Sequence, residues 1–283
     1  MVRCRFPSAG TAVRCAVSGG PDSLALLVLA VAAGCRVTAV HVDHGLRAGS
    51  AAEADVVAAA AARLGAAFEA RRAEVAQGPN LEARARAARY AVLGPGALTG
   101  HTADDQAETV VLNLLRGAGL DGLAGIRHDG RRPILALRRS DTLAVCTEVG
   151  LSPVRDPSNG DPRFRRNRVR AEVLPQLDTV AGRDVTVLLA RQAELLADDA
   201  DLLAALAADV DASDAAALRA APRALARRAV RTWLRAESDA ERHPPDAATV
   251  ERVLAVARGE SRATDVGGGR RVERSAGRLR LTR

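Results

Sequence analysis

Residues 18–23 read Ser-Gly-Gly-Pro-Asp-Ser and lie between an apolar run and a pattern that indicates a helix. Gly19 and Gly20 allow the backbone to turn sharply, and a helix that begins at this turn presents N–H groups with no partner inside the helix. Such groups attract anions, so we expect the turn to hold phosphates. The alternative is structural only, because Asp22 or Ser23 could cap the helix.

The chain contains no lysine, which limits the chemistry of this turn. A Walker A loop needs a lysine on the phosphates, and pyridoxal Schiff bases and amine nucleophiles need one as well. These three classes are therefore excluded. The bias toward alanine and arginine is typical of biased coding, so the missing lysine indicates which chemistry is impossible and not which was selected.

Three polar side chains, His41, Asp43 and His44, lie at the end of a second β-branched segment. Zinc usually takes three or four ligands, whereas two histidines without a nearby cysteine provide two. We therefore expect these side chains to line a nucleotide pocket. His41 could instead be a buried residue at the end of a strand.

A third polar motif begins with His101 and carries carboxylates at the start of a predicted helix. Asp104 and Asp105 in a first turn would interact favourably with the helix dipole, which is a structural role. Asp104 and Glu108 are four residues apart and so share one face of the helix. Together with Asp22 they could hold magnesium on phosphates or bind a cationic substrate.

Arginine is concentrated after a loop rich in proline, asparagine and aspartate. Five of the eight residues 163–170 are arginines, and Asp156 and Asn159 lie in the preceding loop. Such a cluster could contact an RNA backbone, and Phe164 could stack on a base. A capped loop followed by a charged helix start is the structural alternative. Farther upstream, Arg116 could contact a phosphate.

The formal net charge is +7. A basic balance indicates a polyanionic partner, because arginines that bind phosphates release counterions. A second arginine cluster lies closer to the C-terminus, where a solvated helix face would explain it nearly as well. Its members are Arg223, Arg227, Arg228 and Arg231.

Short β-branched runs alternate with alanine-rich helical stretches over residues 12–137, as in a parallel sheet covered on both faces. Ligands of such sheets bind at the carboxyl ends of the strands, where the three polar motifs fall. We therefore predict an α/β fold with a doubly wound parallel sheet. The predicted strands are 12–17, 36–42, 66–72, 97–101 and 132–136. The predicted helices are 22–33, 50–64, 80–93 and 104–116.

The rest of the chain has a different character. After a helix near 140–149 and the arginine-rich segment, alanine, leucine, aspartate and arginine recur at helical spacing. We predict a catalytic domain over 1–180 and a smaller, mainly helical domain over 181–283, with alternation in the tail that fits a hairpin. The helices of the second domain are predicted near 183–208, 222–236 and 246–258.

Cysteine usage and hydropathy indicate the setting. The four cysteines, Cys4, Cys15, Cys35 and Cys146, form no paired motif, which fits reduced thiols that fill the core. Aromatic residues are only 2%, so we expect an aliphatic core. The longest apolar run is shorter than the roughly 20 residues that cross a bilayer, and no signal-peptide pattern is present, so we expect a cytoplasmic protein.

Five motifs, taken in order, resemble those of the tRNA(Ile)-lysidine synthase family, which belongs to the PP-loop ATP pyrophosphatases. They are SGGPDS, HVDHGLR, HTADDQAET, GAGLDGLAGI and DPSNGDPRFRRNRVR. The match spans about 16–177, and the order of five motifs is much more specific than any one of them. The segment from about 182 to the end resembles, more loosely, the tRNA-binding accessory domain of that family.

The resemblance implies a ligase with an adenine nucleotide α hydrolase-like sheet. ATP would adenylate carbon two of the wobble cytidine in tRNA(Ile) with a CAU anticodon, and free lysine would then attack through its ε-amine. AMP and pyrophosphate would be released. The implied cofactors are ATP and magnesium, and the partners are this tRNA and free lysine. Whether the chain forms a homodimer stays open.

The resemblance also implies roles for the motif residues. Asp22, Asp104, Asp105 and Glu108 would be catalytic, with Asp22 near magnesium and the other carboxylates binding or deprotonating lysine. ATP would be bound by Ser18, Gly19, Gly20, Pro21, Asp22, Ser23, His44, His101 and Arg116. tRNA would be bound by Arg163, Phe164, Arg165, Arg166, Asn167, Arg168, Arg170, Arg227, Arg228 and Arg231, with Asp156 and Asn159 in the adjoining loop.

Other functions known for proteins with a similar phosphate-binding loop stay open for this chain. An enzyme that moves sulfur onto tRNA typically has paired cysteines, which this sequence lacks. Amidating synthetases usually bring a glutaminase partner and do not need the basic segment at 163–170. A domain that only senses ATP would bind nucleotide without tRNA-dependent turnover.

Overall fold

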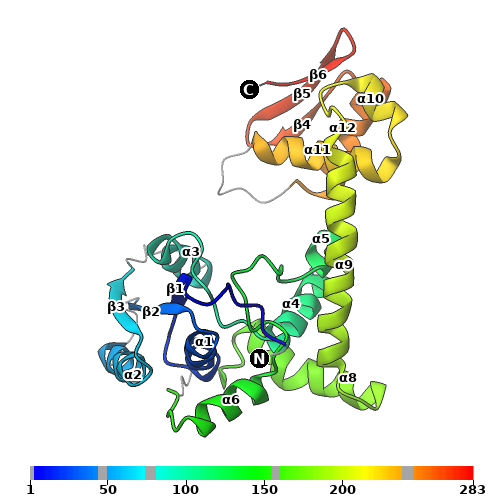
Figure 1. Cartoon of the computed structure of the whole chain (residues 1–283). Helices are drawn as coiled ribbons and strands as arrows, with labels where there is room; N and C mark the ends of the chain where they lie inside the picture. Colours follow the sequence, from blue (N-terminus) through cyan, green and yellow to red (C-terminus); the bar gives the residue numbers. More distant parts are fainter. Residues whose placement is uncertain (1–2, 44–49, 74–80, 155–159, 238–244, 283) are drawn as a thin grey trace. The chain divides into compact units, whose positions relative to one another are not determined.

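The computed structural model describes residues 3–43, 50–73, 81–154, 160–237 and 245–282. The chain folds as two compact units, residues 1–197 and 198–283, each with its own aliphatic core (Figure 1). The division falls inside helix α9 (Val185–Ala208), whereas the sequence placed it between residues 180 and 181. Within the described residues, no helix combines the length and hydropathy needed to cross a bilayer.

The sheet of the first unit consists of three parallel strands. Its central strand, β2 (Arg36–Asp43), pairs with β1 (Ala12–Ala16) on one side and with β3 (Ala67–Arg72) on the other. The register places Ala12 opposite Arg36 and Thr38 opposite Ala67. Because the strands are parallel, their carboxyl ends meet at one edge, and the glycine turn leaves β1 there.

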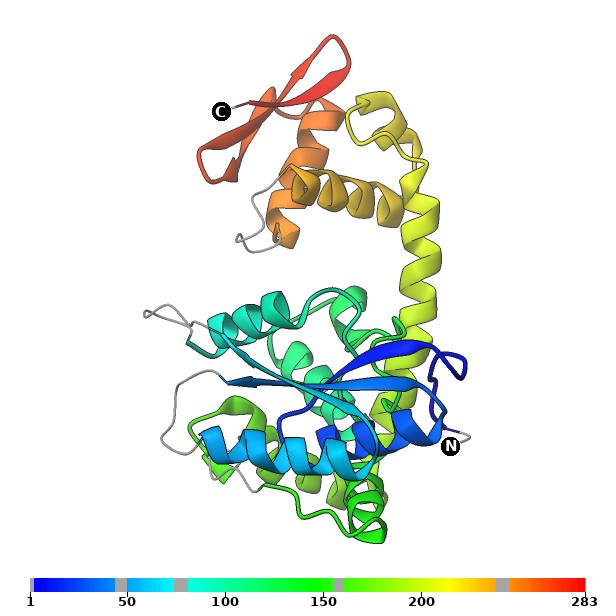
Figure 2. The ribbon, with the colours of Figure 1, turned by 60° about the vertical axis from the view of Figure 1, so that its left-hand side comes forward.

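The helices next to this sheet are α1 (Pro21–Ala32), α2 (Ser50–Arg63) and α3 (Leu81–Leu93). α1 and α2 lie on one face, where Val37 and Ala39 of β2 join their core, and α3 lies on the other (Figure 2). On the α3 face, Val40 of β2 packs with Leu93. Neighbouring residues of β2 thus serve opposite cores, and the predicted α/β, doubly wound fold is confirmed.

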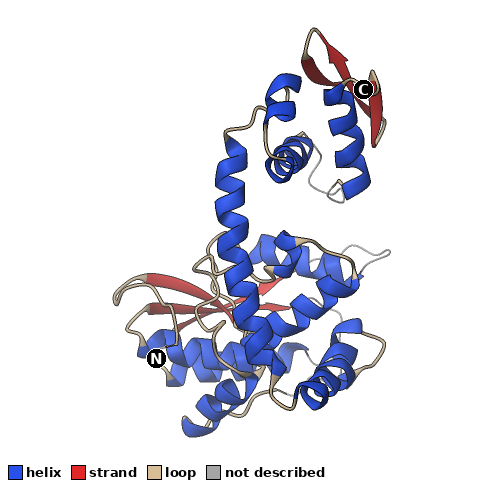
Figure 3. Cartoon of the chain, turned by 90° about the vertical axis from the view of Figure 1, so that its right-hand side faces the viewer, coloured by secondary structure: helices blue, strands red, loops and turns tan. Residues whose placement is uncertain are grey.

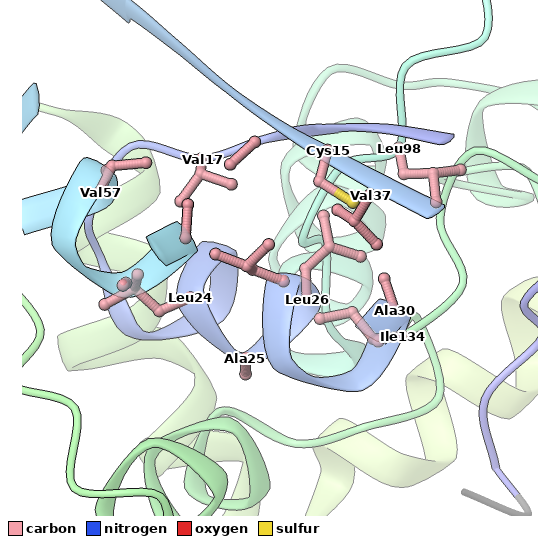
Figure 4. Close-up of a cluster of buried hydrophobic side chains, with 14 of the residues drawn as sticks. Cys15, Val17, Leu24, Ala25, Leu26, Ala30, Val37, Val57, Leu98 and Ile134 are labelled. Carbon is pink, nitrogen blue, oxygen red and sulfur yellow. The ribbon is translucent and has the colours of Figure 1, made fainter. Parts of the chain in front are cut away.

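The main core of the first unit is aliphatic (Figure 4). Leu24 and Leu26 of α1 are completely buried. They pack with Cys15 of β1 and with Val17, which comes directly after that strand. Ile134 closes the same cluster. Each large aliphatic side chain buried in this way contributes about 1.5 to 3 kcal/mol, so the start of α1 is held firmly on the sheet.

Two predicted strands are wrong. Residues 97–101 contribute a single parallel bridge, in which Leu98 lies opposite Cys15 at the edge of β1. Residues 132–136 form a turn instead, with the N–H of Leu137 donating to the carbonyl of Ile134 at 2.9 Å. A short apolar run in a core can form a strand or another buried segment, and the periodicity of its hydrophobic residues does not distinguish the two.

The helices that follow the sheet are α4 (Ala103–Leu115), α5 (Leu120–Leu123), α6 (Arg139–Glu148), α7 (Arg165–Arg168) and α8 (Leu174–Ala181). α4 and α6 agree with their predictions to within one residue, and α6 packs against α1. A π-helical segment, η2 (Val169–Val173), joins α7 to α8, so much of the arginine-rich segment is helical.

The elements of the second unit are α10 (Ala215–Ala220), α11 (Arg223–Ala236), α12 (Ala247–Arg258), β4 (Ala263–Gly267), β5 (Arg270–Ser275) and β6 (Arg278–Thr282). The strands form an antiparallel sheet in the order β4-β5-β6, drawn in red beside the helices in Figure 3. β5 and β6 form the predicted hairpin, and α11 and α12 agree with prediction to within one residue. β4 was missed because consecutive glycines follow its polar sequence.

Candidate active site

The glycine turn leaves the start of α1 without a side-chain cap. Gly20 is the N-cap residue, and Gly19 has a φ of +86°, which favours glycine. The hydroxyl of Ser23 donates to the carbonyl of Gly20 (2.9 Å) and accepts from the N–H of Ser18 (3.2 Å). The expectation that Asp22 or Ser23 caps α1 is therefore wrong, and the N–H groups of the first turn are left for an anion.

Two segments from elsewhere in the chain press against this turn. A Cβ on Gly100 would lie 2.6 Å from the carbonyl oxygen of Asp22, so only glycine fits there. His101 comes directly after this contact and is thereby placed beside the start of α1. On another side, the N–H of Val154 donates to the carbonyl of Gly19 at 2.9 Å. Val154 was missed because an apolar loop residue gives no chemical signal.

The predicted carboxylates lie at the start of α4, next to the segment that touches the turn. Thr102 is the N-cap, and its N–H and hydroxyl donate to Oδ2 of Asp105 at 2.9 and 3.1 Å. This capping box orients Asp105 and leaves its Oδ1 for other partners. Asp104 accepts from the backbone N–H of Arg139 at 2.8 Å and from Nε of Arg138 at 3.1 Å.

Arg139, the first residue of α6, joins carboxylates of two helices. Its Nε lies 3.4 Å from Oδ2 of Asp22, its Nη2 3.2 Å from Oδ1 of Asp105, and its Nη1 3.3 Å from Oε1 of Glu108. The hydroxyl of Thr142, also on α6, donates to Asp22. The structure thus gathers three of the four predicted carboxylates around one guanidinium, while the fourth, Asp104, accepts from the backbone N–H of the same residue. Arg139 was missed because arginine is abundant and this arginine lies in no motif.

Glu108 has no solvent-exposed side-chain surface and is held by three arginines. Besides Arg139, Arg166 donates through Nε to Oε2 and Arg170 through Nε to Oε1, both at 2.6 Å. Both arginines were predicted to face tRNA. Instead they point inward, which explains how a fully buried carboxylate is tolerated.

Proton binding differs between two carboxylates of this cluster. Burial raises the pKa of Asp22 above its ordinary value, although the hydroxyl of Thr142 and the charge of Arg139 oppose the shift. Burial acts on Asp104 in the same direction, but hydrogen bonds from Arg138 and from the backbone N–H of Arg139 outweigh it and hold the pKa of Asp104 below its ordinary value. Neighbouring carboxylates with opposite shifts are common in sites that move protons.

The other side chains of the arginine-rich segment lie closer to the surface. Arg163 pairs with Asp161, and 86% of the Arg163 side chain is exposed. Arg168 pairs with Glu172, and the Asn167 amide donates to the Asp161 carbonyl. The exposed members of the segment are Arg163, Phe164, Arg165 and Arg168.

The structure does not bring Arg116 to the glycine turn. Arg116 is the C-cap of α4, whereas Asp104 lies in the first turn of that helix. The two ends of this 13-residue helix lie about 20 Å apart, so Arg116 is far from Asp104. His44, Asp156 and Asn159 lie outside the described residues.

The four arginines predicted as a second cluster lie on α11, whose opposite face is buried in the core of the second unit. Arg223 and Arg227 both pair with Glu251 of α12. Arg228 and Arg231 are half-buried. The alternative of a solvated helix face thus describes Arg223 and Arg227, which are exposed.

A dedicated metal site is absent from the described part of the chain, where no three His, Cys, Asp or Glu side chains are arranged to share an ion. His41 is 3% exposed, with its Nδ1 3.0 Å from the carbonyl oxygen of Val17, in keeping with a buried residue at the end of a strand. Asp22 fits magnesium in another way, because this ion is commonly held by one or two carboxylates together with substrate phosphates.

The cysteines are free thiols. Burial raises the pKa of Cys15 to about 12, and burial together with the Asp22 charge raises that of Cys146 to about 11. Both therefore stay protonated at neutral pH, so neither provides the thiolate that sulfur chemistry requires.

Comparisons with known proteins agree with this geometry. Residues 5–177 match the PP-loop domain family, and residues 214–280 match the TilS substrate binding domain family. The chain is 47% identical over 245 residues to the tRNA(Ile)-lysidine synthase of Nocardia farcinica. The aligned region covers 81% of this chain and 77% of that relative. It is 41% identical over 273 residues to the tRNA(Ile)-lysidine synthase of Rhodococcus opacus, with 91% and 84% covered.

A solved structure with a similar fold is the U34-tRNA thiolase NcsA from Methanococcus maripaludis. Its TM-score is 0.53 at 17% sequence identity, over 67% of this chain and 73% of that one. At this identity the likeness concerns the fold alone.

Proposed function

From the membership of this chain in the tRNA(Ile)-lysidine synthase family, we propose that the glycine turn, the start of α4 and the start of α6 form one active site. The enzyme uses ATP to form lysidine in tRNA. The observation that carries the proposal is the contact between Gly100 and the carbonyl of Asp22, because it joins the uncapped start of α1 to the carboxylates of α4.

The start of α1 would bind the phosphates of ATP. Its first N–H groups have no side-chain cap, and Ser18 and Ser23 brace the turn that presents them. Aligned N–H groups stabilise the charge that develops on a departing pyrophosphate. Adenylation of the wobble cytidine at carbon two then converts its oxygen into a good leaving group, AMP. Asp22 would hold magnesium against the phosphates, and the ion would supply further positive charge there.

The carboxylates of α4 would bind free lysine. An ammonium group needs acidic partners, and it must lose a proton before its nitrogen attacks the adenylated base. Asp105 and Glu108 lie on the side of α4 that faces Arg139, and both contact its guanidinium. Asp104 accepts from the Arg138 guanidinium and from the first backbone N–H of α6, and these bonds hold its pKa below the ordinary value, so its proposed role is to orient the start of α6. The ammonium would then be bound by Asp105 and Glu108, the two carboxylates of α4 that contact the Arg139 guanidinium.

Exposed and half-buried basic residues would bind the tRNA. Arg163, Arg165 and Arg168 would contact phosphates, and Phe164 would stack on a base. Arg227, Arg228 and Arg231 on α11 would add phosphate contacts from the second unit. An enzyme that acts on this substrate would work in the cytoplasm.

The test is incorporation of radiolabelled lysine into total tRNA by purified protein with ATP and magnesium. Label in the tRNA that depends on ATP is the expected result. ATP binding without label would instead favour a nucleotide sensor and contradict the proposal. A reaction with labelled arginine in place of lysine is the matched control and should leave the tRNA unlabelled.

A further inference from the structure

The carboxylates of the proposed active site are already paired with arginine side chains. These carboxylates are Asp22, Asp104, Asp105 and Glu108. The guanidinium groups are those of Arg138, Arg139, Arg166 and Arg170, of which Arg138 also pairs with Asp184. Each of the four carboxylates thus accepts from at least one arginine. An incoming ammonium therefore meets carboxylates that already hold a cation.

Arg139 occupies the place that an incoming ammonium would need. It contacts Asp22, Asp105 and Glu108 at 3.4, 3.2 and 3.3 Å. Arg166 holds Glu108 at 2.6 Å, the length of a strong charge-assisted bond. Arg139 makes the longest of the three arginine contacts with Glu108, at 3.3 Å against 2.6 Å for Arg166 and Arg170, so its bond is the one most easily released.

Arg139 also lies beside the expected position of the phosphates. Its partner Asp22 is in the first turn of α1, and Thr142 fixes the same carboxylate to α6. A triphosphate at the start of α1 brings several negative charges within reach of this guanidinium. Arginine binds phosphate oxygens in a bidentate manner, and its long side chain can reorient while the backbone stays in place.

We infer that Arg139 is the resident counterion of the lysine site. The phosphates of ATP draw its guanidinium away from the carboxylates, so that nucleotide binding creates the acidic pocket for lysine. The inference rests on the proposed function. It makes Arg139 a positioning residue that couples the two substrates and orders their binding, with ATP before lysine. By linkage, lysine must strengthen nucleotide binding by the same factor.

The first test measures lysine affinity of the wild-type full chain by equilibrium dialysis with radiolabelled lysine. The dialysis is run with magnesium, with and without α,β-methylene ATP. This analogue has a methylene bridge between its first two phosphates and so cannot be cleaved there. Couplings between two ligands typically span about 5- to 150-fold. We expect lysine to bind at least about 10-fold more tightly with the nucleotide present.

Variants of α6 test whether Arg139 carries the coupling. In Arg139→Gln the carboxylates lose the one cation that bridges Asp22, Asp105 and Glu108, so lysine should bind without nucleotide and the nucleotide dependence should fall to about 2-fold or less. Arg139→Lys keeps the charge and should restore much of the dependence. Arg3→Gln is the matched control, since Arg3 is exposed and pairs with Asp141 on the same helix. This variant should behave as the wild type does.

The outcomes separate the inference from the proposed function. Equal lysine affinity of the wild type with and without nucleotide overturns the inference, even if Arg139→Gln fails to fold. So does an unchanged nucleotide dependence in a folded Arg139→Gln variant. If lysine binds in neither dialysis while label still enters tRNA, the inference fails and the function stands. If no label enters tRNA under any condition, the proposed function fails and the inference with it.

Discussion

Nε of Arg166 donates to Oε2 of Glu108 at 2.6 Å, although 58 positions of sequence separate the two residues. The bond ties the arginine-rich segment to the carboxylates of α4. It divides that segment into inward arginines that organise the site and outward arginines that are exposed at the surface, where a polyanion could reach them. A run of basic residues that looks uniform in sequence thus has two different tasks.

Replacing Glu108 by Gln should destabilise the fold strongly. The change removes the buried anion that three guanidinium groups share, and breaking buried pairs of this kind costs about 3 to 5 kcal/mol. Urea denaturation measures the loss. The control Glu172→Gln removes the exposed partner of Arg168 and should change the free energy of unfolding by less than about 1 kcal/mol. A Glu108→Gln effect as small as the control's would contradict the assigned role.

Gly100→Ala should impair the nucleotide site. The new Cβ would lie 2.6 Å from the carbonyl oxygen of Asp22, so the start of α1 must shift. Overpacking of this kind costs about 1 to 3 kcal/mol, and we expect a lower Tm and weaker ATP binding by calorimetry. Gly119→Ala, where an added Cβ meets nothing within 4 Å, is the control. Wild-type ATP affinity in Gly100→Ala would show that the contact does not shape the site.

The stabilising effect of Asp104 should depend on pH in a defined direction. Its pKa is held below the ordinary value of 3.8, so its contribution is complete above that pH and is lost as the pH falls through the lower value of the folded state. At pH 7, Asp104→Asn should cost about 1 to 3 kcal/mol, because hydrogen bonds to a charged group are lost. Denaturation should show the same difference at pH 7 and pH 5 and a smaller one at pH 3.5 and below. A difference that grows on acidification would refute the assignment.

Charge reversal at Arg165 should weaken tRNA use and spare ATP binding. Arg165 is exposed at the start of α7, and a lost phosphate contact raises the KM for tRNA and lowers the dependence of binding on salt. Arg191→Glu, an equal change of charge on the exposed face of α9, is the control. Similar KM values for the two variants would mean that only net charge matters.

The fold was largely predictable because alternation of strands and helices is a strong signal and because the polar motifs follow strands. Placement of the carboxylates at the edge of the sheet was therefore predicted correctly for Asp104 and Asp105. The inward turn of Arg166 and Arg170 was not, since burial of a charge depends on a partner far away in sequence. The same reason hid Arg139, whose three partners lie on α1 and α4.

The central claim, that the start of α1 is where ATP is cleaved, is tested most directly by pyrophosphate release in the presence of tRNA, lysine and magnesium. Asp22→Ala should abolish this release, whereas Asp198→Ala, which removes an exposed carboxylate from α9, should leave it at the wild-type rate. Wild-type release by a folded Asp22→Ala variant would contradict the account.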